Sequence, residues 1–100
     1  MIVLTAILRA QPGKGDAMQA ALDEMTAYVI QNERGTIGFY VCRDGDDPLR
    51  FITYERFADR AALDAHNTSA YRDTWIARYG ALLDGDLVLY IGRETAAKHS

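Results

Sequence analysis

Apolar and polar residues along the first third of the chain follow two patterns, which predict a strand and then a helix. Residues 2–10 form an apolar run rich in strand-forming residues, and this run ends at the breaker QPGKG. Apolar residues then recur at helical spacing, at Met18, Leu22, Met25 and Val29. We expect this helix to begin at a capping box of Asp16 and Gln19 and to end near Asn32, before Gly35.

The middle of the chain predicts a hairpin of two antiparallel strands. The runs TIGFYVCR (36–43) and LRFITYERF (49–57) are rich in β-branched and aromatic residues, and DGDDP between them supplies turn residues. The side chains of the second run divide between two faces, with Ile52 and Tyr54 on one and Phe51, Thr53, Glu55 and Phe57 on the other. Both faces are partly apolar, so we expect both to be covered.

The last helical region is divided by the polar residues NTS. Asp59 is placed to cap a short helix over residues 60–67, and His66 lies on its apolar face. Either Thr68 or Ser69 caps the second helix. That helix carries a stripe of aromatic residues at a spacing of four, formed by Tyr71, Trp75 and Tyr79.

With LVLYIGR (87–93) as the last strand, the order β-α-β-β-α-β predicts an α+β protein of the ferredoxin-like class, with an antiparallel sheet and helices on one face. We expect one domain over residues 1–100, with a core at 2–92 and a frayed tail at 93–100. In a monomer, the sheet face without helices would expose apolar side chains to water. A homodimer that packs two sheets face to face, as a dimeric α/β barrel, would cover them.

The net charge and the cysteine content indicate which partners and which cellular compartment to expect. The formal net charge is −3 and no basic stripe exists, so we expect no nucleic-acid partner. Cys42 is the only cysteine, which favours a reducing compartment. The apolar N-terminus is too short to span a membrane and lacks a leader pattern. These features predict a cytoplasmic protein without a membrane partner.

Few residues of the sequence suit a catalytic or metal-binding role. No phosphate-binding loop, nucleophile elbow or pair of ligands at metal spacing is present, so we expect no metal and no cofactor. His66 is the best candidate for a reacting group, as a general base or as a donor that steadies a substrate anion. Spacing alone favours the alternative, a structural histidine that is hydrogen-bonded to a backbone carbonyl in the core.

Three aromatic residues with polar tips could form a cleft for an aromatic ligand beside His66, namely Tyr54, Tyr71 and Trp75. The alternative is that this stripe fills the core. Glu55 follows Tyr54 directly and therefore lies on the other face of its strand. For Glu55 we expect a salt bridge or a contact across the dimer, with Arg50, Arg56 or Arg78 as the candidate partners.

The stretch NERGTIGFYVCRDGDDPLRFITYERFADRAALDAHNTSAYRDTW resembles the antibiotic biosynthesis monooxygenase family. The likeness covers residues 2 to 92. Its most specific part is the string from Tyr54 and Glu55 through Phe57 to AALDAH, and it includes Gly35 and the Asp-Pro turn. The family more often has Trp or Tyr in place of Phe57.

The resemblance implies a dimeric barrel and a monooxygenase that oxidises a small phenolic or hydroquinone-type aromatic substrate with O2, without flavin, haem or metal. In such chemistry a deprotonated phenol gives an electron to O2, and the radicals recombine to a peroxide that collapses to a quinone. By similarity, His66 takes the proton or holds the phenolate. Tyr54, Tyr71 and Trp75 would bind the substrate as walls and hydrogen-bond donors.

Two other functions remain open at this stage. One is an isomerase that moves a proton within a small carbonyl metabolite, and the other is a dimeric module that binds aromatic metabolites without turnover. A haem-degrading branch of the superfamily uses an Asn, a Trp and a haem-ligating His. The matching positions here are Ala6, His66 and Ile76, so we exclude haem degradation.

Overall fold

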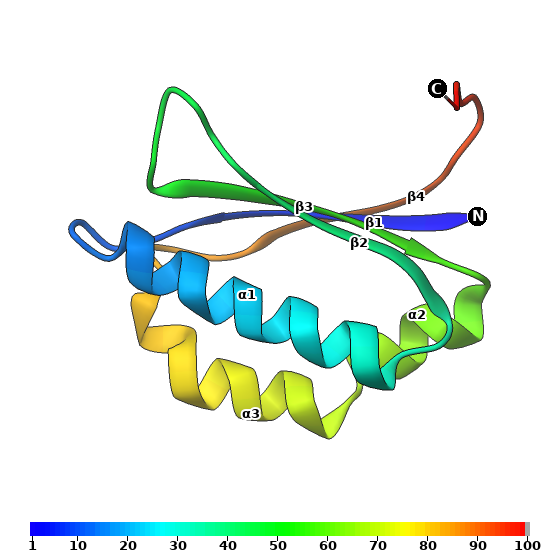
Figure 1. Cartoon of the computed structure of the whole chain (residues 1–100), viewed down its shortest axis with the longest axis horizontal. Coiled ribbons are helices and arrows are strands. Elements are labelled where there is room, and N and C mark those ends of the chain that lie inside the picture. Colours follow the sequence, from blue (N-terminus) through cyan, green and yellow to red (C-terminus); the bar gives the residue numbers. More distant parts are fainter. Residues whose placement is uncertain (100) are drawn as a thin grey trace.

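The computed structural model describes residues 1–99 and confirms the predicted order of elements (Figure 1). The second helical region is divided at Thr68 and Ser69, as the sequence predicts. No helix in the described residues is long and apolar enough to cross a membrane. The elements are β1 (Ile2–Arg9), α1 (Gly15–Asn32), β2 (Thr36–Arg43), β3 (Arg50–Phe57), α2 (Arg60–Asn67), α3 (Ala70–Tyr79), the 3-10 turn η1 (Gly80–Leu82) and β4 (Val88–Arg93).

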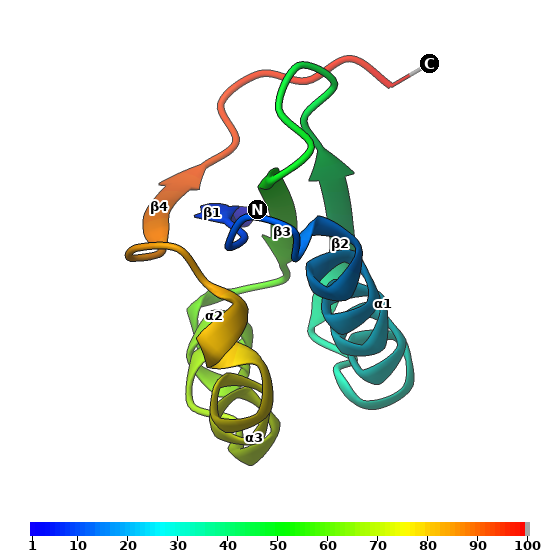
Figure 2. The same ribbon diagram turned by 90° about the vertical axis from the view of Figure 1, so that its left-hand side faces the viewer.

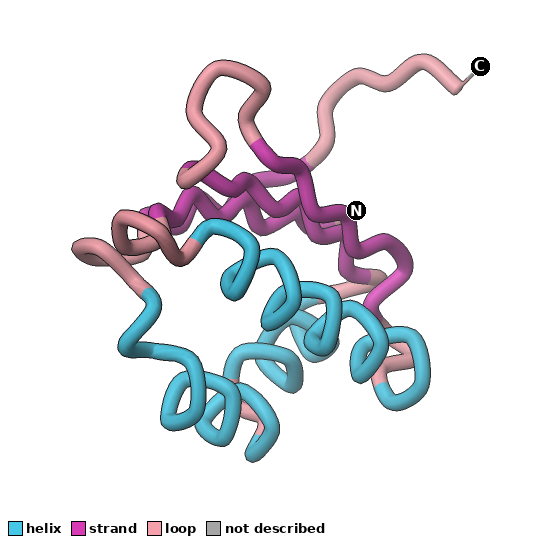
Figure 3. Tube along the Cα trace, turned by 60° about the vertical axis from the view of Figure 1, so that its left-hand side comes forward, coloured by secondary structure: helices cyan, strands magenta, loops and turns pink. Residues whose placement is uncertain are grey.

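The strands form one antiparallel sheet in the order β2-β3-β1-β4, which is the ferredoxin-like arrangement. The helices lie together on one face of this sheet (Figure 2). The β2–β3 loop and the C-terminal segment extend on the other side (Figure 3). We therefore call the two sheet faces the helix face and the open face.

The alternation along β3 separates these faces as the sequence predicts. Phe51, Thr53, Glu55 and Phe57 are buried on the helix face, whereas Tyr54 lies on the open face. On the open face the register places Tyr54 beside Tyr40 of β2 and Thr5 of β1, and Thr5 beside Tyr90 of β4. A row of three tyrosines thus crosses the sheet.

Two buried clusters fill the space between the sheet and the helices. The larger cluster lies under α1 and α3 and comprises Leu8, Ala10, Met18, Ala21, Leu22, Phe51 and Trp75. The smaller cluster lies under α2 and comprises Leu4, Ala6, Phe57 and Leu63. The helical spacing of apolar residues in α1 therefore does build the core, with Met18 and Leu22 almost fully buried.

The capping predictions hold for two helices and fail for the third. Asp59 accepts a hydrogen bond from the Ala62 amide, and Ser69 caps α3. The predicted capping box of Asp16 and Gln19 is wrong. Helix α1 begins at Gly15 with Lys14 at the N-cap, two residues before the predicted cap, so Asp16 lies in the first turn and its exposed side chain pairs with Arg43 instead.

The predicted tail at residues 93–100 includes Ser100, which lies outside the described residues. Arg93 is the last residue of β4. Glu94 accepts hydrogen bonds from Tyr54 and Arg56, and its amide donates to the carbonyl of Met1. This end of β4 is therefore tied to the open face of the sheet.

A close backbone approach at Gly35 sets the position of α2. A Cβ atom at Gly35 would lie 2.6 Å from the Cβ of Ala62, which no ordinary contact allows. The Gly35 carbonyl also accepts a hydrogen bond of 3.0 Å from the Ala58 amide, just before α2 begins. The absence of a side chain at Gly35 therefore lets α2 lie against the turn that follows α1.

We predict that Gly35→Ala lowers the free energy of unfolding by ~1–3 kcal/mol, because the added methyl group overpacks this contact. Ala62→Gly removes the opposing methyl group and alone costs about 1 kcal/mol as a glycine within a helix. In the double variant the two losses should be less than additive, which urea unfolding of all four proteins would measure. Strictly additive losses would contradict a direct contact.

Candidate functional site

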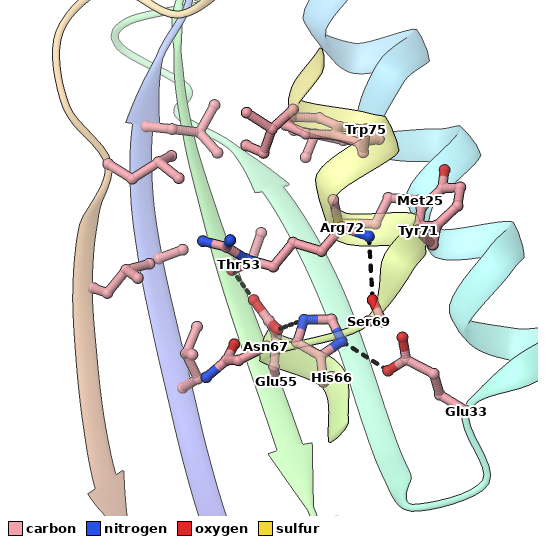
Figure 4. Close-up of a pocket in the computed structure, with 17 residues that line it drawn as sticks. Met25, Glu33, Thr53, Glu55, His66, Asn67, Ser69, Tyr71, Arg72 and Trp75 are labelled. Atoms are coloured by element: carbon pink, nitrogen blue, oxygen red, sulfur yellow. Dashed lines mark hydrogen bonds and ion pairs between the residues drawn. The ribbon is translucent and has the colours of Figure 1, made fainter. Parts of the chain in front are cut away.

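A mostly apolar cavity lies between the helix face of the sheet and the helices α1, α2 and α3 (Figure 4). Its apolar walls come from β1, β4, α1 and α3. Polar groups gather around the junction of α2 and α3. The polar lining residues are Glu33, Thr53, Glu55, His66, Asn67, Ser69 and Arg72.

His66 stands between two carboxylates (Figure 4). Its Nδ1 atom lies 2.7 Å from Oε1 of Glu33, and its Nε2 atom lies 3.0 Å from Oε1 of Glu55. Only 12% of the His66 side chain is exposed. The rings of Phe57 and Phe39 flank the imidazole, with centroids at 5.3 and 6.1 Å. The histidine is thus both buried and paired on each ring nitrogen.

Glu55 is the most buried ionisable residue of the cavity, with 4% exposure. Its Oε2 atom accepts a hydrogen bond of 2.7 Å from the Thr53 hydroxyl. Its Oε1 atom is buried, contacts His66 only as an ion pair and makes no hydrogen bond of regular geometry within the described residues. One oxygen of this buried carboxylate therefore faces the His66 ring and lacks a regular hydrogen bond.

The predicted arginine partners of Glu55 are wrong. Arg50 and Arg56 lie on the open face of β3, where Arg50 pairs with Asp44 and Arg56 pairs with Glu94. Arg78 pairs with Glu24 on the far side of the helices. Alternation along the strand separates Glu55 from its neighbouring arginines, so the only cation that it pairs with in the described residues is His66.

Glu33 holds the other side of His66 and was not predicted from the sequence. It directly follows α1, and its amide donates to the Val29 carbonyl. The Thr36 hydroxyl donates to Oε1 of Glu33 at 2.8 Å, and this atom also contacts His66. The turn at Gly35 brings these residues together.

The two carboxylates determine the charge of His66. Burial opposes protonation, but the close contacts of the ring with Glu33 and Glu55 and the Coulomb attraction of both carboxylates outweigh it and raise the pKa of His66 to about 9. Burial alone would raise the pKa of Glu33, but hydrogen bonds from His66 and Thr36 lower it overall. At neutral pH the ring is therefore an imidazolium held by two carboxylates.

Trp75 and Tyr71 line the cavity with their rings, while their polar tips point to α1. The Trp75 indole N–H donates to the Ala21 carbonyl at 2.9 Å. The Tyr71 hydroxyl donates to Glu24 at 2.8 Å, and its ring stacks on Tyr28 with centroids 3.8 Å apart. Burial and the Glu24 hydrogen bond raise the pKa of Tyr71 to about 12. These residues therefore both wall the cavity and pack the core.

The structure does not bring Tyr54 together with His66. Tyr54 lies on the open face, and its hydroxyl donates to Glu94 at 2.8 Å. That hydrogen bond and partial burial raise the pKa of the Tyr54 phenol. Of the predicted site residues, the structure thus gathers His66, Tyr71 and Trp75 around one cavity and places Tyr54 on the other side of the sheet.

Two polar residues of the cavity, Asn67 and Arg72, were also missed by the sequence analysis. Figure 4 shows the side chain of Arg72 extending from α3 across the cavity toward β3. No pattern within α3 distinguishes this arginine from those on the surface. Within residues 1–99 no three His, Cys, Asp or Glu side chains are arranged to hold a metal ion.

Chemically, the polar end of the cavity presents two carboxylates, an imidazolium and a guanidinium next to mostly apolar walls. Such a set can accept a proton from a bound hydroxyl and hold the resulting anion. The apolar walls suit a flat ring.

Solved structures with the same fold come from several organisms. One from Nitrosomonas europaea, provisionally named an antibiotic biosynthesis monooxygenase, is 24% identical, has a TM-score of 0.87 and matches over 96% of this chain and 100% of that chain. One from Caulobacter crescentus, with the same provisional name, is 23% identical, with a TM-score of 0.88 over 95% and 90% of the chains. A protein of unknown function from Nitrosomonas europaea is 25% identical, with a TM-score of 0.84 over 99% and 93%.

These likenesses establish the fold of the chain. Identities this low say little about its activity. No curated protein matches the chain. The family model of the antibiotic biosynthesis monooxygenases matches residues 1–78, well over half of the sequence, and confirms the resemblance that the sequence motifs indicated. The chain therefore belongs to the antibiotic biosynthesis monooxygenase family.

Proposed function

We propose that this protein is a cofactor-independent monooxygenase that oxidises a small phenolic or hydroquinone-type aromatic substrate with O2. The observation that carries the proposal is the Oε1 atom of Glu55, a buried carboxylate oxygen without a regular hydrogen bond in a cavity walled by aromatic rings. A family whose members are named monooxygenases supports the reaction class. A ring hydroxyl placed at this oxygen would meet a proton acceptor in surroundings that exclude water.

The proposed reaction leaves most of the reactivity to the substrate. The hydroxyl proton passes to Glu55, and the phenolate gives one electron to O2. Superoxide and the phenoxyl radical then couple at a ring carbon to form a peroxide. The proton held by Glu55 passes to the outer peroxide oxygen. Cleavage of the O–O bond and loss of the ring proton then give a quinone and one water, so a phenol and one O2 are fully accounted for and Glu55 returns to its carboxylate form.

The charge of His66 suggests how it takes part. A ring that is already protonated at neutral pH cannot accept the substrate proton, so we assign that role to Glu55. His66 stays positively charged beside Glu55 and stabilises negative charge at this end of the cavity. Of the two roles that the sequence analysis offered for His66, we thus favour the one in which it holds the anion.

A proton-shuttling isomerase is a second candidate, favoured by the pairing of a buried carboxylate with an imidazolium. Glu55 could remove a proton from one carbon of a carbonyl compound while His66 steadies the enolate. This reaction needs no O2. It therefore differs from the first candidate in a way that can be measured directly.

We also propose that the protein forms a homodimer through the open face of the sheet. Large side chains are exposed there, with Tyr40 at 53%, Tyr54 at 37% and Tyr90 at 62%. A row of tyrosines across one sheet offers rigid, amphipathic contact area. In such a dimer Tyr54 would contribute to the interface and would not contact substrate in the cavity beside His66.

We predict O2 uptake when the purified protein, treated with a chelator and given no flavin, meets a panel of hydroquinones and naphthols. One atom of 18O2 should enter the product. Glu55→Gln should lower kcat by about 10²–10⁴-fold, because an amide cannot accept the proton. Glu94→Gln makes the same change on the open face and should leave kcat unaltered.

Uptake no faster than in buffer across the panel would contradict the oxygenase. Solvent deuterium entering a carbonyl product without O2, and lost in Glu55→Gln, would favour the isomerase instead. Saturable binding of aromatic compounds without any product would leave a binding module as the remaining function.

We predict that the His66 ion pairs stabilise the fold in a pH-dependent manner. The pKa of His66 rises from 6.5 to about 9 on folding, so this stabilisation is complete below about pH 6.5 and is lost as the pH rises through about 9. The difference in unfolding free energy between wild type and His66→Gln should therefore shrink by on the order of 2 kcal/mol from about pH 6 to about pH 10. Urea unfolding measures it, with His99→Gln as the control, and a constant difference would disprove the pairing.

We predict that the protein sediments as a dimer at micromolar concentration. Tyr90→Glu places a charge on the open face and should shift the equilibrium to monomer, because a buried unpaired charge is costly. Ile30→Glu is the matched control, since Ile30 is 77% exposed on α1 and lies away from the open face. A folded wild-type monomer, or dissociation caused only by Ile30→Glu, would refute this interface.

A further inference from the structure

We propose that Arg72 binds the oxyanion of the substrate, which makes this cavity selective for aromatic compounds whose hydroxyl group can ionise. The inference extends the proposed function, on which it rests for the class of ligand. Arg72 extends from α3 into the cavity in which Glu55 and His66 lie (Figure 4). It is the one guanidinium that lines this cavity in the described residues.

The pairing of the other arginines makes Arg72 unusual. Three arginines in the described residues are neither buried nor fully exposed, namely Arg9, Arg56 and Arg72. Arg9 pairs with Asp47, and Arg56 pairs with Glu94. In contrast, the Arg72 guanidinium forms no ion pair and no hydrogen bond within residues 1–99, and only the backbone amide of Arg72 contacts a side chain, that of Ser69.

A half-buried guanidinium without an anion is costly, because arginine cannot lose its proton and has given up part of its hydration. Glu55 faces the same cavity but does not form an ion pair with Arg72; its ion pair is with His66. An oxygen anion on a ligand would supply the missing partner. Figure 4 shows the Arg72 and Glu55 side chains converging on the same part of the cavity.

The charges facing this position balance in a way that suits proton transfer. Glu33 and Glu55 carry two negative charges, and His66 and Arg72 carry two positive charges. When a ligand hydroxyl gives its proton to Glu55, one negative charge moves from the carboxylate to the ligand oxygen, and the total does not change. Arg72 is placed to hold that charge in its new position, while the Asn67 amide adds a neutral donor to the same lining.

The test uses 4-nitrophenol, whose phenolate absorbs visible light, so that its ionisation can be followed without turnover. Bound to the wild-type protein, its pKa should fall by about 1–2 units relative to the free compound, as expected for an opposite charge within a few ångströms. Arg72→Met should abolish this shift, while Arg72→Lys should keep part of it. Binding of 4-nitroanisole, which cannot ionise, should not depend on Arg72.

Arg60→Met is the matched control, because Arg60 pairs with Asp64 on the exposed side of α2 and does not line the cavity. It removes the same charge and should leave the shift intact. If Arg72→Met does not fold, the pKa shift of bound 4-nitrophenol is measured with Arg72→Gln, which keeps hydrogen-bond donors but loses the charge. An unshifted pKa, a shift that persists without the Arg72 charge, or no saturable binding of 4-nitrophenol would each overturn the inference.

Failure of the anion site at Arg72 and failure of the oxygenase reaction can be distinguished by experiment. An Arg72-dependent pKa shift without O2 uptake from any phenol would uphold the anion site and refute the oxygenase. O2 uptake with the same kcat and KM in Arg72→Met would uphold the oxygenase and refute the anion site.

Discussion

The buried contact of His66 with Glu33 and Glu55 is the interaction on which the arrangement of the cavity depends. It joins the end of α1, the middle of β3 and the last turn of α2, three segments that are far apart in the sequence. Removing charged groups from water is costly, and loss of one partner would leave another charge unpaired inside the protein. The three segments are therefore held in one relative position, and that position fixes the polar end of the cavity.

Alternation along β3 gives the two faces of the sheet separate sets of contacts. Thr53 and Glu55 face the cavity, where the Thr53 hydroxyl donates to one carboxylate oxygen of Glu55 and His66 contacts the other. Their neighbours in the chain, Tyr54 and Arg56, donate hydrogen bonds to Glu94 on the open face. A one-residue shift in the register of β3 would exchange these groups and place an arginine in the core.

The fold could be predicted from the sequence because its signals are local. Helical spacing, runs of β-branched and aromatic residues and turn residues marked the four strands and three α-helices, and the caps at Asp59 and Ser69 depend on neighbouring residues. The cavity could be predicted only in part. Helical spacing identified His66, but Glu33 is 33 residues away and reaches it only through the Gly35 turn. Periodicity also could not show that the polar tips of Tyr71 and Trp75 are bound to α1.

The charge of His66 changes what the family motif means in this chain. A lone histidine in a sparse site suggests a general base, but two carboxylates raise its pKa to about 9 and make it a cation at neutral pH. In the proposed function, the histidine is the fixed charge and Glu55 accepts the proton of the substrate. On this view the protein contributes mainly the placement of charges around a bound hydroxyl, and the reactivity comes from the substrate and O2. A site that works by charge placement needs few reactive side chains, but it needs each charge held firmly, which the ion pairs of His66 provide.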